Sequence, residues 1–99
     1  MFAKEIEETK IFIPTAFSPN GDTENERLCI YGTNCIRSLA FTIYSRWGEK
    51  VFESDDPEEC WDGIYKRIEM NEGIFVYYLN ATLNNNKTIT QRGNITLIK

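Results

Sequence analysis

The chain contains no histidine, few cysteines and prolines, and no long hydrophobic run among its 99 residues. Without histidine, the usual base of nucleophilic and acid–base sites is missing, which argues against common hydrolase arrangements. No run approaches the roughly 20 apolar residues of a membrane-spanning helix, and the acidic N-terminus does not resemble a signal peptide. The net charge of -4 argues against a nucleic-acid binder. The composition favours one small, non-enzymatic domain.

The three cysteines leave one thiol over after any single disulfide, and the sequence does not select among the three pairings. Cys35 and Cys60 flank the hairpin that we predict below, so we weigh a bridge between them, closing a loop of about 25 residues, against three buried thiols. Zinc usually needs four ligands at closer spacing, so metal binding is the weaker interpretation. We predict no cofactor and no metal.

Residues 39–53 predict a β-hairpin. Leu39, Phe41 and Ile43 alternate with more polar residues, which is the period of two that a strand imposes. Gly48 stands in the following turn, where a short hairpin usually needs a backbone conformation that a Cβ atom disfavours. The hairpin is therefore specified locally.

Arg46 and Trp47 share this turn. We expect the Trp47 ring to fold onto the end of the sheet, while the Arg46 guanidinium stays in water or lies over an aromatic face. Trp47 and Trp61 would alternatively form a carbohydrate-stacking pair, although two tryptophans in a small domain are more often core and corner residues.

The rest of the chain consists of short strand candidates separated by turn residues. We predict residues 1–10 as a linker and 11–99 as one domain, with strands at 11–13, 27–31, 73–83 and 88–98, the last either one strand bent at Gly93 or two strands. The 73–83 run is apolar on both faces, so we expect it to be central. About seven strands without a convincing helix predict an antiparallel, immunoglobulin-like β-sandwich.

Two polar stretches carry groups that ligate or transfer protons in other proteins. The 18–26 loop offers oxygens from Asn20, Asp22, Asn25 and Glu26, of the kind that calcium takes, but such residues more often stabilise turns. The acidic residues of 54–59 are more typical of a solvated loop than of a catalytic pair.

Five segments, in chain order, resemble one family: IPTAFSPNGD, IYSRWGEKVFES, WDG, GIFVYYL and RGNITLIK. They are similar to the gliding-motility-associated C-terminal domain, the type B sorting domain of the type IX secretion system of Bacteroidota. The resemblance covers residues 11–99. SPNGD and RWGEKVF are its specific parts, whereas WDG alone is a weak signal.

The resemblance implies a non-enzymatic sorting domain that directs attached cargo across the outer membrane, after passage through the periplasm, to the cell surface or the medium. It implies a monomer that contacts the type IX machinery and a PorP/SprF-like outer-membrane protein, without direct membrane insertion and without binding nucleic acid. The alternative interpretation is an adhesive or carbohydrate-binding immunoglobulin-like surface module.

The family pattern falls on Asn20, Gly21, Asp22 and Asn25 of the loop, on Arg46, Trp47 and Gly48 of the turn, and on Trp61, Asp62 and Gly63. Ser45 stands where asparagine often precedes Arg-Trp-Gly, and Lys99 stands where arginine often ends the chain. We add Lys99 and the edge of the last strand as candidate contacts. A chain that starts at Met1 without a cargo domain suggests an excised C-terminal piece or a short open reading frame.

Overall fold

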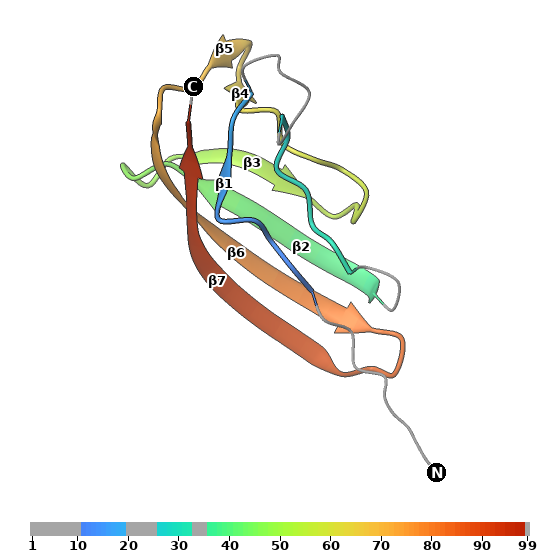
Figure 1. The fold of residues 1–99 in the computed structure, drawn as a ribbon. Coiled ribbons are helices and arrows are strands. Elements are labelled where there is room, and N and C mark those ends of the chain that lie inside the picture. Colours follow the sequence, from blue (N-terminus) through green and yellow to red (C-terminus); the bar gives the residue numbers. More distant parts are fainter. Residues whose placement is uncertain (1–10, 20–25, 33–35, 99) are drawn as a thin grey trace.

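The computed structural model describes residues 11–19, 26–32 and 36–98 and shows strands joined by turns (Figure 1). None of the described segments forms a helix able to cross a membrane. The strands are β1 (Ala16–Phe17), β2 (Ile36–Tyr44), β3 (Lys50–Ser54), β4 (Ile64–Tyr65), β5 (Ile68–Glu69), β6 (Gly73–Leu83) and β7 (Thr88–Leu97).

Five strands form the main sheet in the order β1-β7-β6-β2-β3, and β4 pairs with β5 in a small second sheet. The described chain is therefore an all-β sandwich, as predicted. One pair departs from the expected antiparallel pattern, because β1 runs parallel to β7, with Phe17 opposite Leu97. A parallel pair is available here because β1 and β7 lie far apart in the sequence and no hairpin joins them.

Strand β6 occupies the centre of the sheet, as its apolar sequence predicts, and pairs with β2 on one side and β7 on the other. Its inner side chains, including Phe75 and Leu79, are buried. On its outer face, Ile74 and Tyr78 remain 50% and 46% exposed. The outer face of the sheet thus presents apolar side chains to solvent.

Irregular segments, rather than the expected strands at 11–13 and 27–31, supply most of the layer that faces the sheet. Each of these segments forms only one isolated bridge, Phe12 with Tyr31 and Leu28 with Trp61. Trp61 is fully buried beneath the sheet, with ring contacts to Phe17, Phe52 and Phe75. The core comprises Ile13, Phe17, Leu28, Ile30, Leu39, Phe41, Ile43, Val51, Trp61, Phe75, Tyr77, Leu79, Ala81, Ile95 and Leu97.

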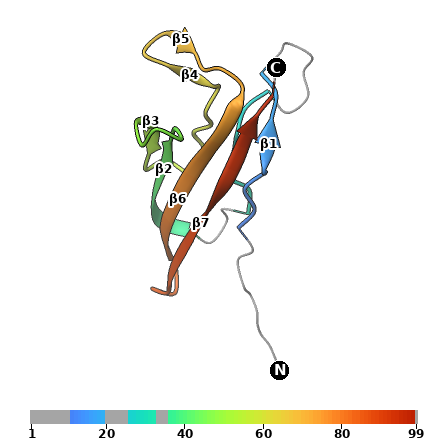
Figure 2. The same cartoon turned by 90° about the vertical axis from the view of Figure 1, so that its left-hand side faces the viewer.

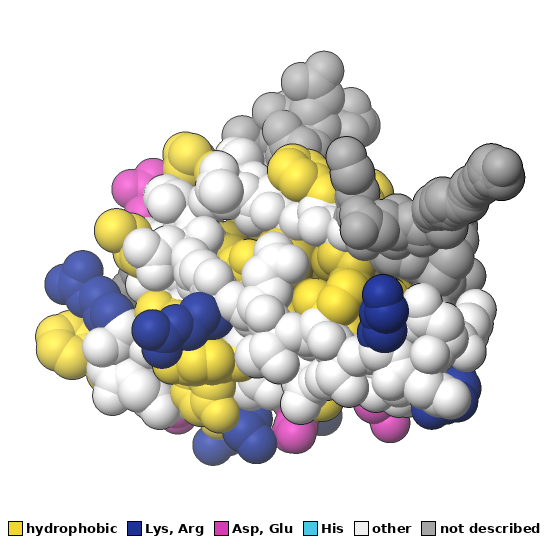
Figure 3. All heavy atoms as spheres, turned by 90° about the horizontal axis from the view of Figure 1, so that it is seen from below, with side chains coloured by type: hydrophobic (Ala, Val, Ile, Leu, Met, Phe, Trp, Pro, Cys, Tyr) yellow, Lys and Arg dark blue, Asp and Glu magenta, His cyan; other side chains and the backbone are white. Residues whose placement is uncertain are grey.

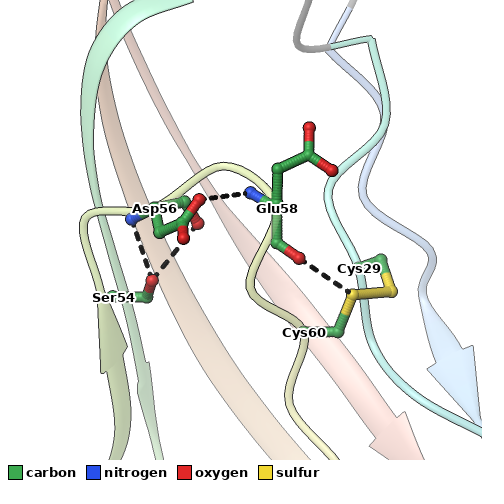
Figure 4. The surroundings of a disulfide bond; sticks show 5 residues. All are labelled: Cys29, Ser54, Asp56, Glu58 and Cys60. Carbon is green, nitrogen blue, oxygen red and sulfur yellow. Dashed lines mark hydrogen bonds between the residues drawn. A yellow bond between two sulfur atoms is a disulfide. The ribbon is translucent and has the colours of Figure 1, made fainter.

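The predicted Cys35–Cys60 pairing is wrong, because Cys60 is bonded to Cys29 (Figure 4). Leu28 and Trp61 exchange two backbone hydrogen bonds, of 2.8 and 2.9 Å. The next antiparallel pair along this contact is Cys29 with Cys60, and their Cα atoms lie 4.5 Å apart. The contact between Leu28 and Trp61 therefore determines the disulfide. Cys35 lies outside the described residues.

The β4–β5 hairpin projects from one end of the molecule and has no counterpart among the predicted strands (Figure 2). Its turn residues Lys66 and Arg67 both have positive φ, 52° and 69°. Such a turn usually carries glycine or asparagine, so its sequence lacks the ordinary signal. This explains why the sequence pattern does not predict it.

The main sheet has two distinct ends. At one end, which we call the Leu97 end, lie the β2–β3 turn, the start of β6 and the close of β7. At the opposite, Thr88 end lies the β6–β7 turn, where Asn86 has a φ of 70°, a left-handed conformation that asparagine tolerates. The described chain begins toward the Thr88 end and runs to β1 at the Leu97 end (Figure 1).

Candidate functional site

The β2–β3 turn is held in one conformation by Ser45. The Ser45 backbone N–H donates to the Glu49 carbonyl at 2.8 Å, and Gly48 N–H donates to the Ser45 carbonyl at 2.9 Å. The Ser45 hydroxyl oxygen accepts hydrogen bonds from the N–H groups of Trp47 and Glu49, each at 3.2 Å. Gly48 has a φ of 89°, which confirms the conformation expected for this glycine. Ser45 therefore holds the turn through four hydrogen bonds within residues 45–49.

Trp47 is 83% exposed, so the expectation that its ring folds onto the sheet is wrong. The Arg46 guanidinium carbon lies 5.2 Å from the centre of the Trp47 ring, which is one of the two placements expected for Arg46. The most exposed large apolar side chain among the described residues is therefore held beside a cation.

Apolar neighbours extend this exposed corner in two directions. A groove runs between the turn and the β5–β6 connection and is lined by Arg46, Trp47, Ile68 and Ile74. A shallower hollow on the outer face is lined by Tyr44, Arg46, Val76 and Tyr78. Tyr44 and Tyr78 meet edge to face, with ring centres 5.6 Å apart. We call this set, Tyr44, Arg46, Trp47, Ile68, Ile74, Val76 and Tyr78, the RWG surface.

The view from below shows hydrophobic side chains at the molecular surface with lysine and arginine side chains beside them (Figure 3). The sequence pattern singled out Arg46 and Trp47 but missed the other members of the RWG surface. Alternation in β2 and β6 does place Tyr44, Val76 and Tyr78 on one face of their strands. That this face is uncovered depends on the layer packing.

The Trp61-Asp62-Gly63 motif is a structural corner. The Trp61 indole N–H donates to the Ile64 carbonyl at 3.2 Å, and the ring is 1% exposed. An Asp62 carboxylate oxygen accepts a hydrogen bond from Ile64 N–H at 3.0 Å and closes the turn. Gly63 has a φ of 84°. A buried Trp61 also excludes the carbohydrate-stacking pair with Trp47.

Gly63 joins distant parts of the chain at the Leu97 end. A Cβ atom at this position would lie 3.4 Å from both Leu97 and Pro19 side chains and 3.6 Å from Phe17. The beginning of the 18–26 loop and the end of β7 thus meet at the motif. Asn20, Gly21, Asp22, Asn25 and Lys99, the other sequence-predicted contacts, lie outside the described residues.

The acidic 54–59 connection uses its polar groups locally (Figure 4). The Ser54 hydroxyl donates to a Glu59 carboxylate oxygen at 2.6 Å, and an Asp56 carboxylate oxygen accepts from Glu58 N–H at 2.8 Å. These bonds stabilise turns and place no two carboxylates across a pocket. Within the described ranges, no three histidine, cysteine or acidic side chains are grouped as a metal site.

The described chain is thus a small β-sandwich that exposes an aromatic corner beside one arginine, with glutamates along the same groove. Residues 11–97 match the family described as CHU_C type IX secretion signal domain. The chain belongs to this family. It is therefore a secretion and sorting domain of the type IX system, which directs attached cargo across the outer membrane to the cell surface or the medium.

One similar solved structure is described as PorZ, an essential bacterial surface component of the type IX secretion system of Porphyromonas gingivalis. The similarity has a TM-score of 0.58 at 13% identity and covers 90% of this chain but only 11% of that chain. At this identity the likeness shows a shared fold. No curated protein matches the chain.

Proposed function

We propose that the type IX machinery reads this domain through the RWG surface. The observation that carries the proposal is Trp47, which is 83% exposed at the tip of a turn that Ser45 holds through hydrogen bonds to Trp47, Gly48 and Glu49. Removing the apolar surface of the Trp47 indole from water is favourable, and in the folded domain only a bound partner can do so.

The composition and rigidity of the RWG surface suit tight recognition. Tryptophan, tyrosine and arginine dominate the residues that carry most binding energy at protein interfaces. The Ser45 hydroxyl already holds the backbone of the turn, so this backbone loses little conformational entropy when a partner binds. The Arg46 guanidinium already lies beside the Trp47 ring.

As the specific partner we propose a PorP/SprF-like outer-membrane protein, which binds the domain as a folded monomer. The sorting unit in this proposal is residues 11–99, with 1–10 as a linker and no catalytic activity of its own. The adhesive or carbohydrate-binding alternative loses its main support, because the Trp61 ring lies inside the core.

The path of the chain fits this arrangement. The described chain begins toward the Thr88 end, and the RWG surface lies at the Leu97 end (Figure 1). Cargo attached before Ile11 would therefore join the domain away from the RWG surface, which leaves that surface accessible to a partner.

The test is export of a fluorescent reporter that carries residues 11–99 at its C-terminus and an inner-membrane export signal at its N-terminus. It is measured in a type IX-competent host and in a mutant lacking the secretion pore. Trp47→Ala should reduce export at least tenfold, because it removes the central side chain of the RWG surface. Its melting temperature should stay near wild type, since an exposed side chain away from the core contributes about 0.5 kcal/mol or less.

Phe12→Ala is the matched control, because Phe12 is another exposed aromatic residue, 60% exposed, that contacts Tyr31 on a different part of the molecule. It should be exported as wild type. Equal export of Trp47→Ala and wild type would refute the RWG surface as the recognised feature. A wild-type reporter that stays in the periplasm of the competent host although its partner is co-expressed would contradict the partner assignment.

A further inference from the structure

The edge of the main sheet at β7 is only partly covered by β1. Thr96 N–H donates to the Thr15 carbonyl at 2.8 Å, and Ile98 N–H donates to the Phe17 carbonyl at 2.9 Å. These bonds reach only the last part of β7, because β1 comprises two residues. The terminal end of the last strand, which the sequence suggested as an open edge, is thus the end that is paired.

Backbone direction then identifies the open part. The N–H and C=O groups of alternate residues point to the same side of an antiparallel strand. The backbone groups of Thr96 point to β1, and no register shift interrupts the β6–β7 pairing. The odd-numbered residues of β7, such as Gly93 opposite Tyr77, therefore direct their backbone groups to β6. Four residues must direct their backbone groups outward: Thr88, Thr90, Arg92 and Asn94. Within the described residues, no strand pairs with them.

The chain itself turns away from this edge. To continue the parallel pairing of β1, residues 8–14 would have to lie along residues 88–94, at the spacing set by Ala16 opposite Thr96. Phe12 exchanges backbone hydrogen bonds of 3.0 and 2.9 Å with Tyr31 on the side away from β7, and no backbone hydrogen bond joins residues 11–14 to residues 88–94. Within the described residues, the pairing of β1 therefore does not continue along the 88–94 edge.

The opposite edge of the sheet is protected in ways that the β7 edge is not. Strand β3 carries a Lys50–Glu53 ion pair, with N–O distance 3.2 Å, and its pairing with β2 has a register irregularity between Ile43 and Tyr44. Charges and bulges are the usual means of preventing edge pairing. The 88–94 stretch has no proline, no lysine and no irregularity.

We propose that the outward backbone groups of Thr88–Asn94 accept an extended segment of a partner protein of the secretion machinery as an added strand, in line with β1. Main-chain hydrogen bonds would supply the affinity. Arg92 is the only charged residue of the stretch, so we expect an acidic residue opposite it in the added strand.

A second copy of this chain fits the edge less well. A symmetric antiparallel pairing centred on Gln91 would place the two Arg92 side chains on one face at diagonal positions, within reach of each other. Their like charges would oppose the pairing. The proposal rests on the sorting function and adds a second contact to the RWG surface.

The test joins amide hydrogen exchange of the 99-residue chain with the reporter export described above. In the isolated chain, the amides of Thr90 and Arg92 should exchange rapidly, whereas those of Gln91 and Gly93 should be protected by β6. Thr90→Pro removes one outward N–H, and proline is tolerated on edge strands. It should reduce export at least tenfold while the cooperative melt is retained. Thr90→Ala keeps the N–H and separates the backbone contact from the side chain.

Strong protection of Thr90 and Arg92 in the isolated chain would overturn the proposal, because the edge would already be occupied. Export of folded Thr90→Pro at the wild-type level would overturn it as well, while leaving the sorting function intact. Loss of export in Thr90→Pro with export retained in Thr90→Ala would support it. Failure of the sorting function is recognised separately, since the wild-type reporter itself would then not be exported.

Discussion

Gly93 of β7 provides the space in which the Tyr77 ring lies. A Cβ atom at Gly93 would come within 2.9 Å of the ring carbon Cε2 and 3.1 Å of the hydroxyl oxygen of Tyr77. The hydroxyl oxygen also accepts a hydrogen bond of 3.0 Å from the Gln91 amide nitrogen. Of the two alternatives predicted for 88–98, the structure has one strand that continues through Gly93. The absence of a side chain at Gly93 gives the Tyr77 ring room to pack.

Gly93→Ala should destabilise the domain by about 1 to 3 kcal/mol, because the Tyr77 ring must leave a well-packed position. Gly73→Ala is the control: the added Cβ atom would lie 4.0 Å from the Asn71 carbonyl oxygen, an ordinary contact, so it should be neutral or slightly stabilising. Urea denaturation of both variants measures the difference. Equal midpoints would show that Tyr77 moves without cost.

The Arg67 position carries backbone strain within the β4–β5 hairpin. Its φ of 69° lies in the left-handed region, which costs a non-glycine residue about 1 to 2 kcal/mol. The adjacent Lys66 has a φ of 52°, and its Nζ atom lies 5.2 Å from the centre of the Tyr65 ring. The hairpin is thus formed by side-chain contact and pairing despite unfavourable turn residues.

At the scale of this element, Arg67→Gly should stabilise the domain by about 0.5 to 1 kcal/mol, because relief of the strain exceeds the entropy cost of glycine. Thermal melting measures it as a rise of a few degrees. Lys87→Gly, which also replaces an exposed basic turn residue but at a position without positive φ, should lower the melting temperature. A fall in both variants would contradict the strain argument.

The segments around Cys29 and Cys60 form a second element, clamped by one disulfide with a sequence separation of 31 residues. In the chain-entropy account, closing such a loop stabilises the fold by roughly 3 to 4 kcal/mol. Disulfides form in oxidising compartments, which agrees with an exported domain.

Cys60→Ser should therefore lower the free energy of unfolding by roughly 3 to 4 kcal/mol and make the melt insensitive to reductant. Cys35→Ser should leave the reductant-sensitive bridge intact. Melting of each variant with and without dithiothreitol tests the pairing. Reductant insensitivity of Cys35→Ser would contradict the Cys29–Cys60 bridge.

At the scale of the whole molecule, the last residues of β7 are part of the hydrophobic core, so they are needed for folding whatever they contribute to sorting. Ile95 and Leu97 are fully buried, and Ile98 N–H is bonded to the Phe17 carbonyl. Removal of residues 95–99 takes away two core side chains and the partner of β1. Loss of export on such a truncation would then report loss of folding.

The 1–94 chain should lack a cooperative thermal transition, because losing the two buried aliphatic side chains alone costs about 4 to 10 kcal/mol, comparable with the stability of a small domain. Circular dichroism melts measure this. Lys99→Glu is the control that changes the terminal charge and keeps every core residue. A cooperative melt of the truncated chain would show that residues 95–99 and their pairing with β1 are dispensable for the fold.

Local patterns determined a large part of this fold. Alternation specified β2 and its buried face, since side-chain direction in a strand depends only on residue parity, and the apolar run of β6 specified its central place. Gly48 specified a turn, because the backbone conformation there depends on the residue itself. The family motifs added the sorting function and the residues Arg46 and Trp47.

Only the tertiary structure decided which pairs meet across the chain. The contact between Leu28 and Trp61 selected Cys29, rather than Cys35, as the partner of Cys60. Packing buried Trp61 and left Trp47 exposed, although the two have the same side chain. The short β1 determined which part of the β7 edge stays open. Such outcomes depend on contacts between residues tens of positions apart, which local periodicity does not encode.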